Sequence, residues 1–169
     1  MAMKFVHLMK NEKFANGIVC FYSTFFNNGE HEIIYFFRDK KESCIREQYS
    51  IKQTEFCTQD SKMGVVAYLK SLKCDYIFLH SLFFTSKEKV QLLLDKELLK
   101  KLVWIEWVAD LYSWRQNGQF KAILKNKINY KFRSSLSNIV CIFPPDVDYV
   151  KKQFPCTSRQ IYYAAYNGF

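Results

Sequence analysis

Short, continuous apolar runs recur along this sequence and alternate with segments whose apolar residues are three or four positions apart. The runs predict buried strands, because they are apolar throughout rather than at every second position. The segments between them predict helices. This alternation is typical of an α/β fold, a three-layer Rossmann-like domain with a mostly parallel sheet between helices. The predicted strands are residues 4–9, 31–37, 74–80, about 101–108, 138–143 and 159–164, with a weaker one near Glu47–Ile51.

Several helix starts can also be predicted. Thr85 and Glu88 form a T-x-x-E capping box, in which each side chain bonds to the backbone N–H of the other residue. Asn11 and Asp60 are expected to cap two earlier helices. No linker or repeat interrupts the 169 residues, so we expect a single domain over 1–169. The predicted helices are residues 11–26, 61–72, 86–94, 119–137 and 144–154.

The chain is basic, with 25 Lys+Arg against 16 Asp+Glu and a formal net charge of +9. Such a surface attracts nucleic acid, anionic membranes or phosphorylated ligands, and charge alone does not choose between them. Nucleic acid is not an expected partner, because no helix-turn-helix, RRM or KH pattern is present. Residues 121–133 contain no acidic residue. Their cations predict either a solvated helix face or a surface that contacts a membrane or a phosphate group. These cations are Lys121, Lys125, Lys127, Lys131 and Arg133.

Several functional classes lack their sequence signatures. The six cysteines contain no C-x-x-C pair, which disfavours a zinc or redox site. No G-x-G-x-x-G, G-x-x-x-x-G-K-[ST], G-x-S-x-G or H-E-x-x-H motif occurs, so common nucleotide, hydrolase and zinc-protease sites are not expected. No signal peptide or membrane-length apolar run is present, which favours a cytoplasmic location.

Polar residues stand at or near the ends of three predicted strands. In parallel sheets ligands bind beyond the carboxyl ends of the strands, so His7, His80 and Asp110 are candidate site residues. Each has a structural alternative: the histidines can be hydrogen-bonded core residues, and Asp110 can cap a helix that begins at Leu111. Glu106 lies within a predicted buried strand, and we expect it at a sheet edge or beside a cation.

Three segments together resemble the 4-alpha-L-fucosyltransferase family, which includes bacterial TDP-N-acetylfucosamine:lipid II N-acetylfucosaminyltransferases. FVHLMKNEKFANGIVCFYSTFF is similar to the opening of that family, and YIFLHSLF is similar to its strand ending in histidine. WIEWVADLYSW resembles its W-G-x-D-L-Y element, with Val108 in place of the glycine. That valine indicates an altered loop, because glycine allows a close approach or a positive φ.

The resemblance implies the N-terminal, acceptor-side half of a GT-B glycosyltransferase, whose nucleotide-sugar is held mainly by a C-terminal domain absent from this chain. It implies transfer of a fucosamine- or fucose-like sugar to a lipid-diphosphate or polysaccharide acceptor, without a metal or another cofactor. Asp110 and His80 would then be the candidate catalytic residues, and His7, Tyr112 and Lys13 would bind substrate. The isolated domain would be inactive and would associate peripherally with the inner face of the cell membrane.

Two other classes of function fit the same sequence. One is an α/β ligand-binding or regulatory module of the receiver or solute-binding type, although a receiver has an acidic cluster after its first strand, where this chain has His7 and Lys10. A protein-interaction domain would expose a large apolar patch, and the 16 phenylalanines are compatible with one.

Overall fold

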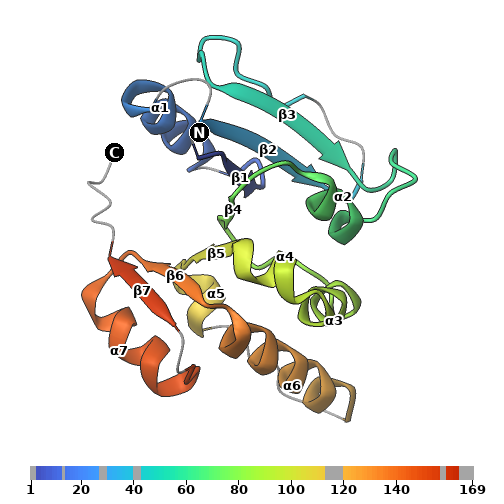
Figure 1. The fold of residues 1–169 in the computed structure, drawn as a ribbon, viewed down its shortest axis with the longest axis vertical. Helices are drawn as coiled ribbons and strands as arrows, with labels where there is room; N and C mark the ends of the chain where they lie inside the picture. Colours follow the sequence, from blue (N-terminus) through green and yellow to red (C-terminus); the bar gives the residue numbers. More distant parts are fainter. Residues whose placement is uncertain are drawn as a thin grey trace. The chain divides into compact units, whose positions relative to one another are not determined.

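The computed structural model describes residues 3–12, 14–26, 30–39, 43–112, 120–156 and 159–163. The chain forms two compact units, one from Met1 to His80 and one from Ser81 to Gly168. Both units alternate strands with helices along the chain, as the sequence predicts (Figure 1).

The first unit has a four-stranded parallel sheet in the order β3-β2-β1-β4. Its central strand β1 pairs with β2 on one side and β4 on the other, so that Phe5 lies opposite both His31 and Tyr76. The strands are β1 (Phe5–Met9), β2 (His31–Phe37), β3 (Lys52–Cys57) and β4 (Tyr76–Leu79), and the helices are α1 (Ala15–Phe25) and α2 (Val65–Ser71).

The second unit has three parallel strands in the order β5-β6-β7. Helix α3 packs against α6, and the Thr85–Glu88 capping box starts α3 as predicted. The strands are β5 (Leu102–Ile105), β6 (Asn138–Cys141) and β7 (Gln160–Tyr163). The helices are α3 (Ser86–Leu94), α4 (Lys96–Lys101), α5 (Val108–Tyr112), α6 (Phe120–Ser135) and α7 (Pro144–Gln153).

The predicted α/β, Rossmann-like fold with a parallel sheet is confirmed. The continuous apolar runs become strands that are buried along most of their length, because helices cover a parallel sheet. Ile33 and Ile34 on β2 are consecutive, point to opposite faces, and are both fully buried. In the described part of the chain, no helix is long and apolar enough to cross a membrane.

Some local predictions are wrong. The weak strand is β3 at Lys52–Cys57 rather than Glu47–Ile51, because β3 buries only Phe56 and so carries little apolar signal. Asp60 does not cap α2, which begins after Gly64. Asn11 does not cap α1 either: Phe14 is the N-cap and makes no side-chain bond there.

The region before β5 also differs from its prediction. A separate helix, α4, is capped by Asp95, whose side chain accepts a hydrogen bond of 3.1 Å from the Leu98 backbone N–H. The strand that follows ends at Ile105 rather than near Val108. Glu106 therefore lies just beyond the strand, at its carboxyl end.

Candidate functional site

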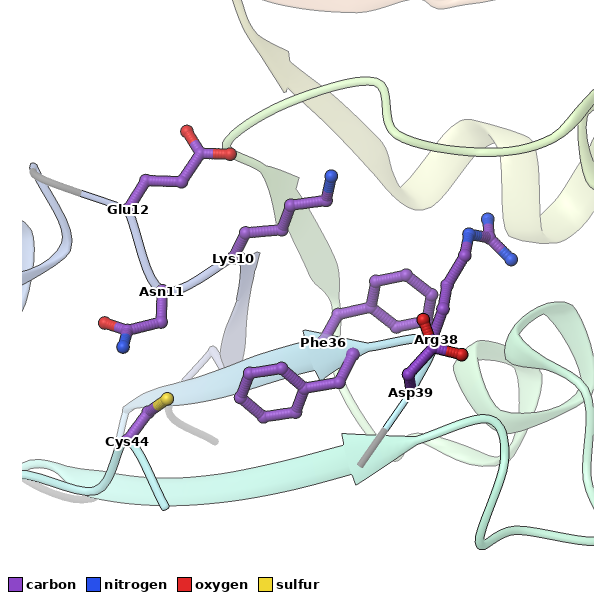
Figure 2. A pocket seen from close by; sticks show the side chains of 8 residues that line it. Lys10, Asn11, Glu12, Phe36, Arg38, Asp39 and Cys44 are labelled. Atoms are coloured by element: carbon purple, nitrogen blue, oxygen red, sulfur yellow. The ribbon is translucent and has the colours of Figure 1, made fainter. Parts of the chain in front are cut away.

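A pocket of about 680 Å³ opens at the carboxyl ends of β1 and β2, where ligands bind in parallel sheets (Figure 2). The segment after β1 contributes a cation, an amide and a carboxylate, and the segment after β2 contributes a cation and a carboxylate. The aromatic rings of β2 line the same space. The lining residues are Lys10, Asn11, Glu12, Phe36, Phe37, Arg38, Asp39 and Cys44.

Arg46 is not a lining residue of this pocket, but it forms hydrogen bonds to two residues that are. Its guanidinium donates to the Asn11 side-chain oxygen at 2.9 Å and to the Cys44 carbonyl at 3.1 Å. It also donates to the Tyr35 hydroxyl at 2.5 Å. One side chain therefore connects the segment after β1 to the segment before β3, which limits the movement of the pocket walls. The pocket was not predicted, although its sequence signal is the polar residues that directly follow two buried strands.

The structure brings His7 and His80 together and adds His31, which the sequence did not single out. One His7 ring nitrogen, Nδ1, lies 3.1 Å from His80 Nε2, and the other, Nε2, lies 2.8 Å from His31 Nδ1. All three rings are buried. His7 and His80 are thus hydrogen-bonded core residues, as the structural alternative allowed, and the His80 ring bonds to His7 rather than to a carbonyl.

Burial sets the charge of these rings. It lowers the pKa of His80 to about 3, and it lowers the pKa of His7 well below its ordinary value, with His80 and His31 adding to that effect. Burial also lowers the pKa of His31, but the Glu30 carboxylate opposes that shift. The three rings are therefore neutral at neutral pH. A neutral imidazole has one N–H and one lone pair, so it can donate on one side and accept on the other.

Asp110 lies in the second unit and holds a loop in place. Its carboxylate accepts from the Leu82 backbone N–H at 3.0 Å and from the Ser81 hydroxyl at 3.3 Å. It does not cap a helix beginning at Leu111, because α5 already begins at Val108. Burial raises the pKa of Asp110, and the Leu82 amide and the Arg133 guanidinium oppose that shift.

Tyr112 and Glu106 both lie next to the carboxyl group of Asp146. The Tyr112 hydroxyl donates to Asp146 at 2.5 Å, and that bond is the main reason that the pKa of Tyr112 rises to about 12. Glu106 is fully buried, and neither of its side-chain oxygens meets an N–H or O–H donor among the described residues. Burial, with the neighbouring Asp146 carboxyl, raises the pKa of Glu106 to about 8. The expectation of a cation beside Glu106 is wrong: its neighbour is an acid.

The basic stretch divides into exposed and buried cations. Arg133 is 4% exposed and donates to the backbone carbonyls of Asp110 at 3.0 Å and Asn129 at 3.4 Å. Its guanidinium also lies 5.6 Å from the centre of the Trp104 ring. Arg133 is thus a structural residue, and its predicted membrane or phosphate contact is wrong. Lys121, Lys125, Lys127 and Lys131 are exposed on α6.

The candidate residues fall in both units. His7 and His80 belong to the first, Asp110 and Tyr112 belong to the second, and Lys13 lies outside the described residues. In the described ranges, no group of three or more His, Cys, Asp or Glu side chains is arranged to hold a metal ion.

Comparison with known proteins returns no family model, no curated protein and no solved structure that matches this chain. The resemblance to the fucosyltransferase family therefore rests on the sequence motifs alone.

Proposed function

We propose that this chain is the acceptor-side domain of a glycosyltransferase that moves a fucosamine- or fucose-like sugar from a nucleotide-sugar to a lipid-linked or surface-polysaccharide acceptor. The observation that carries the proposal is the polar pocket at the carboxyl ends of β1 and β2. Its volume is in the range of small-molecule sites. Carboxylate and amide groups suit sugar hydroxyls, and Lys10 and Arg38 suit a phosphate group.

The proposed reaction is attack of an acceptor hydroxyl on the anomeric carbon of the donor. The C–O bond to the nucleoside diphosphate breaks with its electron pair on the leaving group, and a base removes the hydroxyl proton. Asp110 and His80 are the candidates for that base, one in each unit, and His7 is fully buried and reaches substrate only through His80. The nucleotide-sugar would be held mainly by a second domain, without which this chain would bind acceptor but not turn it over.

Two features favour His80 over Asp110 as the group that meets the hydroxyl. The Asp110 carboxylate already accepts two hydrogen bonds that hold the segment after β4. His80 Nδ1 is buried and has no hydrogen-bond partner in the described part of the chain. The exposed lysines of α6 would add attraction to an anionic membrane surface, where a lipid-diphosphate acceptor resides.

Acceptor binding tests the proposal on the chain itself. Calorimetric titration would compare a short-chain prenyl diphosphate-linked N-acetylglucosamine, the free sugar and inorganic diphosphate. We expect the linked sugar to bind most tightly, and Lys10→Gln and Arg38→Gln each to weaken it about tenfold through a lost charge-assisted contact. Lys127→Gln, which removes the same charge from the exposed face of α6, should leave affinity unchanged.

Equal weakening by Lys127→Gln would mean that only net charge matters, and the pocket would lose its assignment. Absence of binding by all three probes would refute the acceptor-side function and favour a module with a different ligand.

A further inference from the structure

The histidine chain, defined as His31, His7 and His80, joins three neighbouring strands of the first unit. These are the only three histidines in the sequence. His31 begins β2, His7 is in the middle of β1, and His80 directly follows β4. Since β1 lies between β2 and β4 and all three strands are parallel, the chain of rings runs from the amino end of one strand to the carboxyl end of another.

Packing holds the central ring in place. The His7 ring centre lies 4.0 Å from that of Tyr22 on α1 and 4.9 Å from that of Phe78 on β4. The His80 backbone N–H donates to the Leu8 carbonyl at 3.0 Å, which places the His80 backbone at the carboxyl end of β1. The pocket begins at Lys10, the residue directly after β1 and two positions beyond Leu8. His80 and the pocket are therefore at the same edge of this sheet.

The two hydrogen bonds between the rings have to run in the same direction. Each neutral ring offers one N–H, and His7 uses both of its nitrogens, so it donates to one neighbour and accepts from the other. In one arrangement His80 Nε2–H donates to His7 and His7 Nε2–H donates to His31, which leaves a lone pair on His80 Nδ1. In the other arrangement every proton is on the opposite nitrogen.

Neither a metal site nor a purely structural core explains this arrangement. His7 points its two nitrogens at different rings, so the three rings do not converge on one ion. A structural cluster has no reason to leave His80 Nδ1 buried with no partner among the described residues, because an unpaired buried polar atom costs about 1–3 kcal/mol. The unpaired atom is at the end of the chain that lies at the carboxyl edge, where a ligand group could bond to it.

We propose that the histidine chain is a proton relay, which accepts a proton from a ligand hydroxyl at His80 Nδ1 and delivers positive charge to His31. The step rests on the proposed function, in which that hydroxyl attacks the donor sugar. The hydroxyl O–H bond breaks and an Nδ1–H bond forms on His80, while His80 Nε2–H passes its proton to His7 Nδ1. His7 Nε2–H then passes a proton to His31 Nδ1, and the oxygen keeps the electron pair that forms the new glycosidic bond.

The relay explains how a buried histidine with a low pKa can accept a proton at neutral pH. Burial lowers the pKa of His80 to about 3, so His80 alone is a weak base at neutral pH. The relay leaves His80 and His7 neutral after the transfer and places the charge on His31. The Glu30 carboxylate favours that charge, since it raises the pKa of His31 against the effect of burial. In these terms His80 is the catalytic residue, and His7 and His31 act through it.

Nuclear magnetic resonance of the ¹⁵N-labelled chain tests the relay without any substrate, because two-bond ¹H–¹⁵N spectra distinguish the two neutral tautomers and the imidazolium. At neutral pH we expect Nε2–H on both His80 and His7. On acidification, His31 should become charged while His7 and His80 switch to Nδ1–H and stay neutral, all with one midpoint. An Nδ1–H on His80 at neutral pH, or three separate midpoints, would overturn the proposal.

Two variants sharpen the test. In His7→Gln the amide can still bond to both neighbours but cannot pass a proton, so the His80 tautomer should no longer follow His31. Glu30→Gln leaves the three rings intact and should lower the shared midpoint while the rings still titrate together. If His7→Gln does not fold, as judged by circular dichroism, His31→Gln replaces it, and His7 and His80 should then keep their tautomers. Continued switching in a folded blocked variant would refute the relay.

Turnover separates the relay from the proposed function. With TDP-N-acetylfucosamine and a prenyl diphosphate-linked sugar, His7→Gln in the protein with its donor domain should lower kcat about 10²-fold and leave KM unchanged. If kcat is unchanged in a variant whose three histidines no longer titrate together, the relay does not take part in the reaction. A coupled titration without any wild-type turnover would support the relay and refute the transferase function.

Discussion

Glu106→Gln should stabilise this protein at pH 7 to 8 and should not do so at pH 5. Glu106 is fully buried beside Asp146, and both oxygens of Glu106 lack a donor among the described residues. Asp110 on α5 also raises the pKa of Glu106, whereas the backbone N–H of Ile142 lowers it, although it does not reach hydrogen-bonding geometry with either oxygen. Glutamine has nearly the same shape, cannot ionise, and offers an N–H₂ group that can donate to the Asp146 carboxylate.

The magnitude follows from the pKa of Glu106, which rises from 4.5 to about 8 on folding. A carboxyl whose pKa is raised in the folded state binds more protons there than in the unfolded chain. Its contribution therefore favours folding below about pH 4.5, and the free energy of unfolding falls as the pH rises toward 8. Each pKa unit corresponds to about 1.4 kcal/mol, so the penalty at pH 7 is on the order of 3 kcal/mol.

Urea denaturation at pH 5, 6, 7 and 8 measures this effect. Between pH 5 and 8 the free energy of unfolding should fall less steeply for Glu106→Gln than for wild type, with a gain of about 3–4 kcal/mol at pH 8. Glu97→Gln is the matched control, because its side chain is 81% exposed on α4 in the same unit. That change should shift stability by less than about 1 kcal/mol. Parallel pH profiles for wild type and Glu106→Gln would refute a proton held on Glu106.

Three smaller perturbations can be checked by the same denaturation assay. Thr85→Ala removes the N-cap of α3 and should lower the free energy of unfolding by about 1 kcal/mol. Asp110→Ala should cost about 1–3 kcal/mol because the Leu82 N–H loses its acceptor, whereas Asp110→Asn should cost less because its amide oxygen still accepts. Burial lowers the pKa of Lys89 to about 8, so the wild-type free energy of unfolding should rise from pH 8 toward 10 as the unfolded chain keeps the proton longer. Lys89→Met should remove that rise.

The strands and long helices could be predicted because their signals are local. A continuous apolar run such as residues 31–37 specifies a buried parallel strand, and regular spacing specifies α6. The N-cap of α3 could be predicted because the two residues that form it, Thr85 and Glu88, are only three positions apart in the sequence. Strand β3 was misplaced because it gains its stability from pairing with β2, a distant segment, and buries one apolar side chain.

The site was only partly predictable, because sequence position shows which residues lie near strand ends but not which ones pair. His7 and His80 were candidates on that ground, but His31 is at the amino end of its strand and joins them only through the register of β1 and β2. Arg133 looked like one more surface cation of a basic helix. Its burial depends on how α6 packs in the fold, and the spacing of residues along the sequence does not predict that packing.

The polar groups beyond the strand ends differ in charge between the two units. In the first unit the carboxyl edge has the cations Lys10 and Arg38, the acids Glu12 and Asp39, and a neutral His80, so it offers both signs of charge and an imidazole. In the second unit the corresponding edge has Glu106 and Asp146, and the raised pKa of Glu106 keeps a proton there at neutral pH. At both edges, buried polar atoms have no partner among the residues that the structure describes, which lowers stability unless a ligand pairs with them. A bound ligand should therefore raise the free energy of unfolding by more than its contacts with exposed groups provide. This extra stabilisation should be smaller in variants whose unpaired atoms have been removed by substitution.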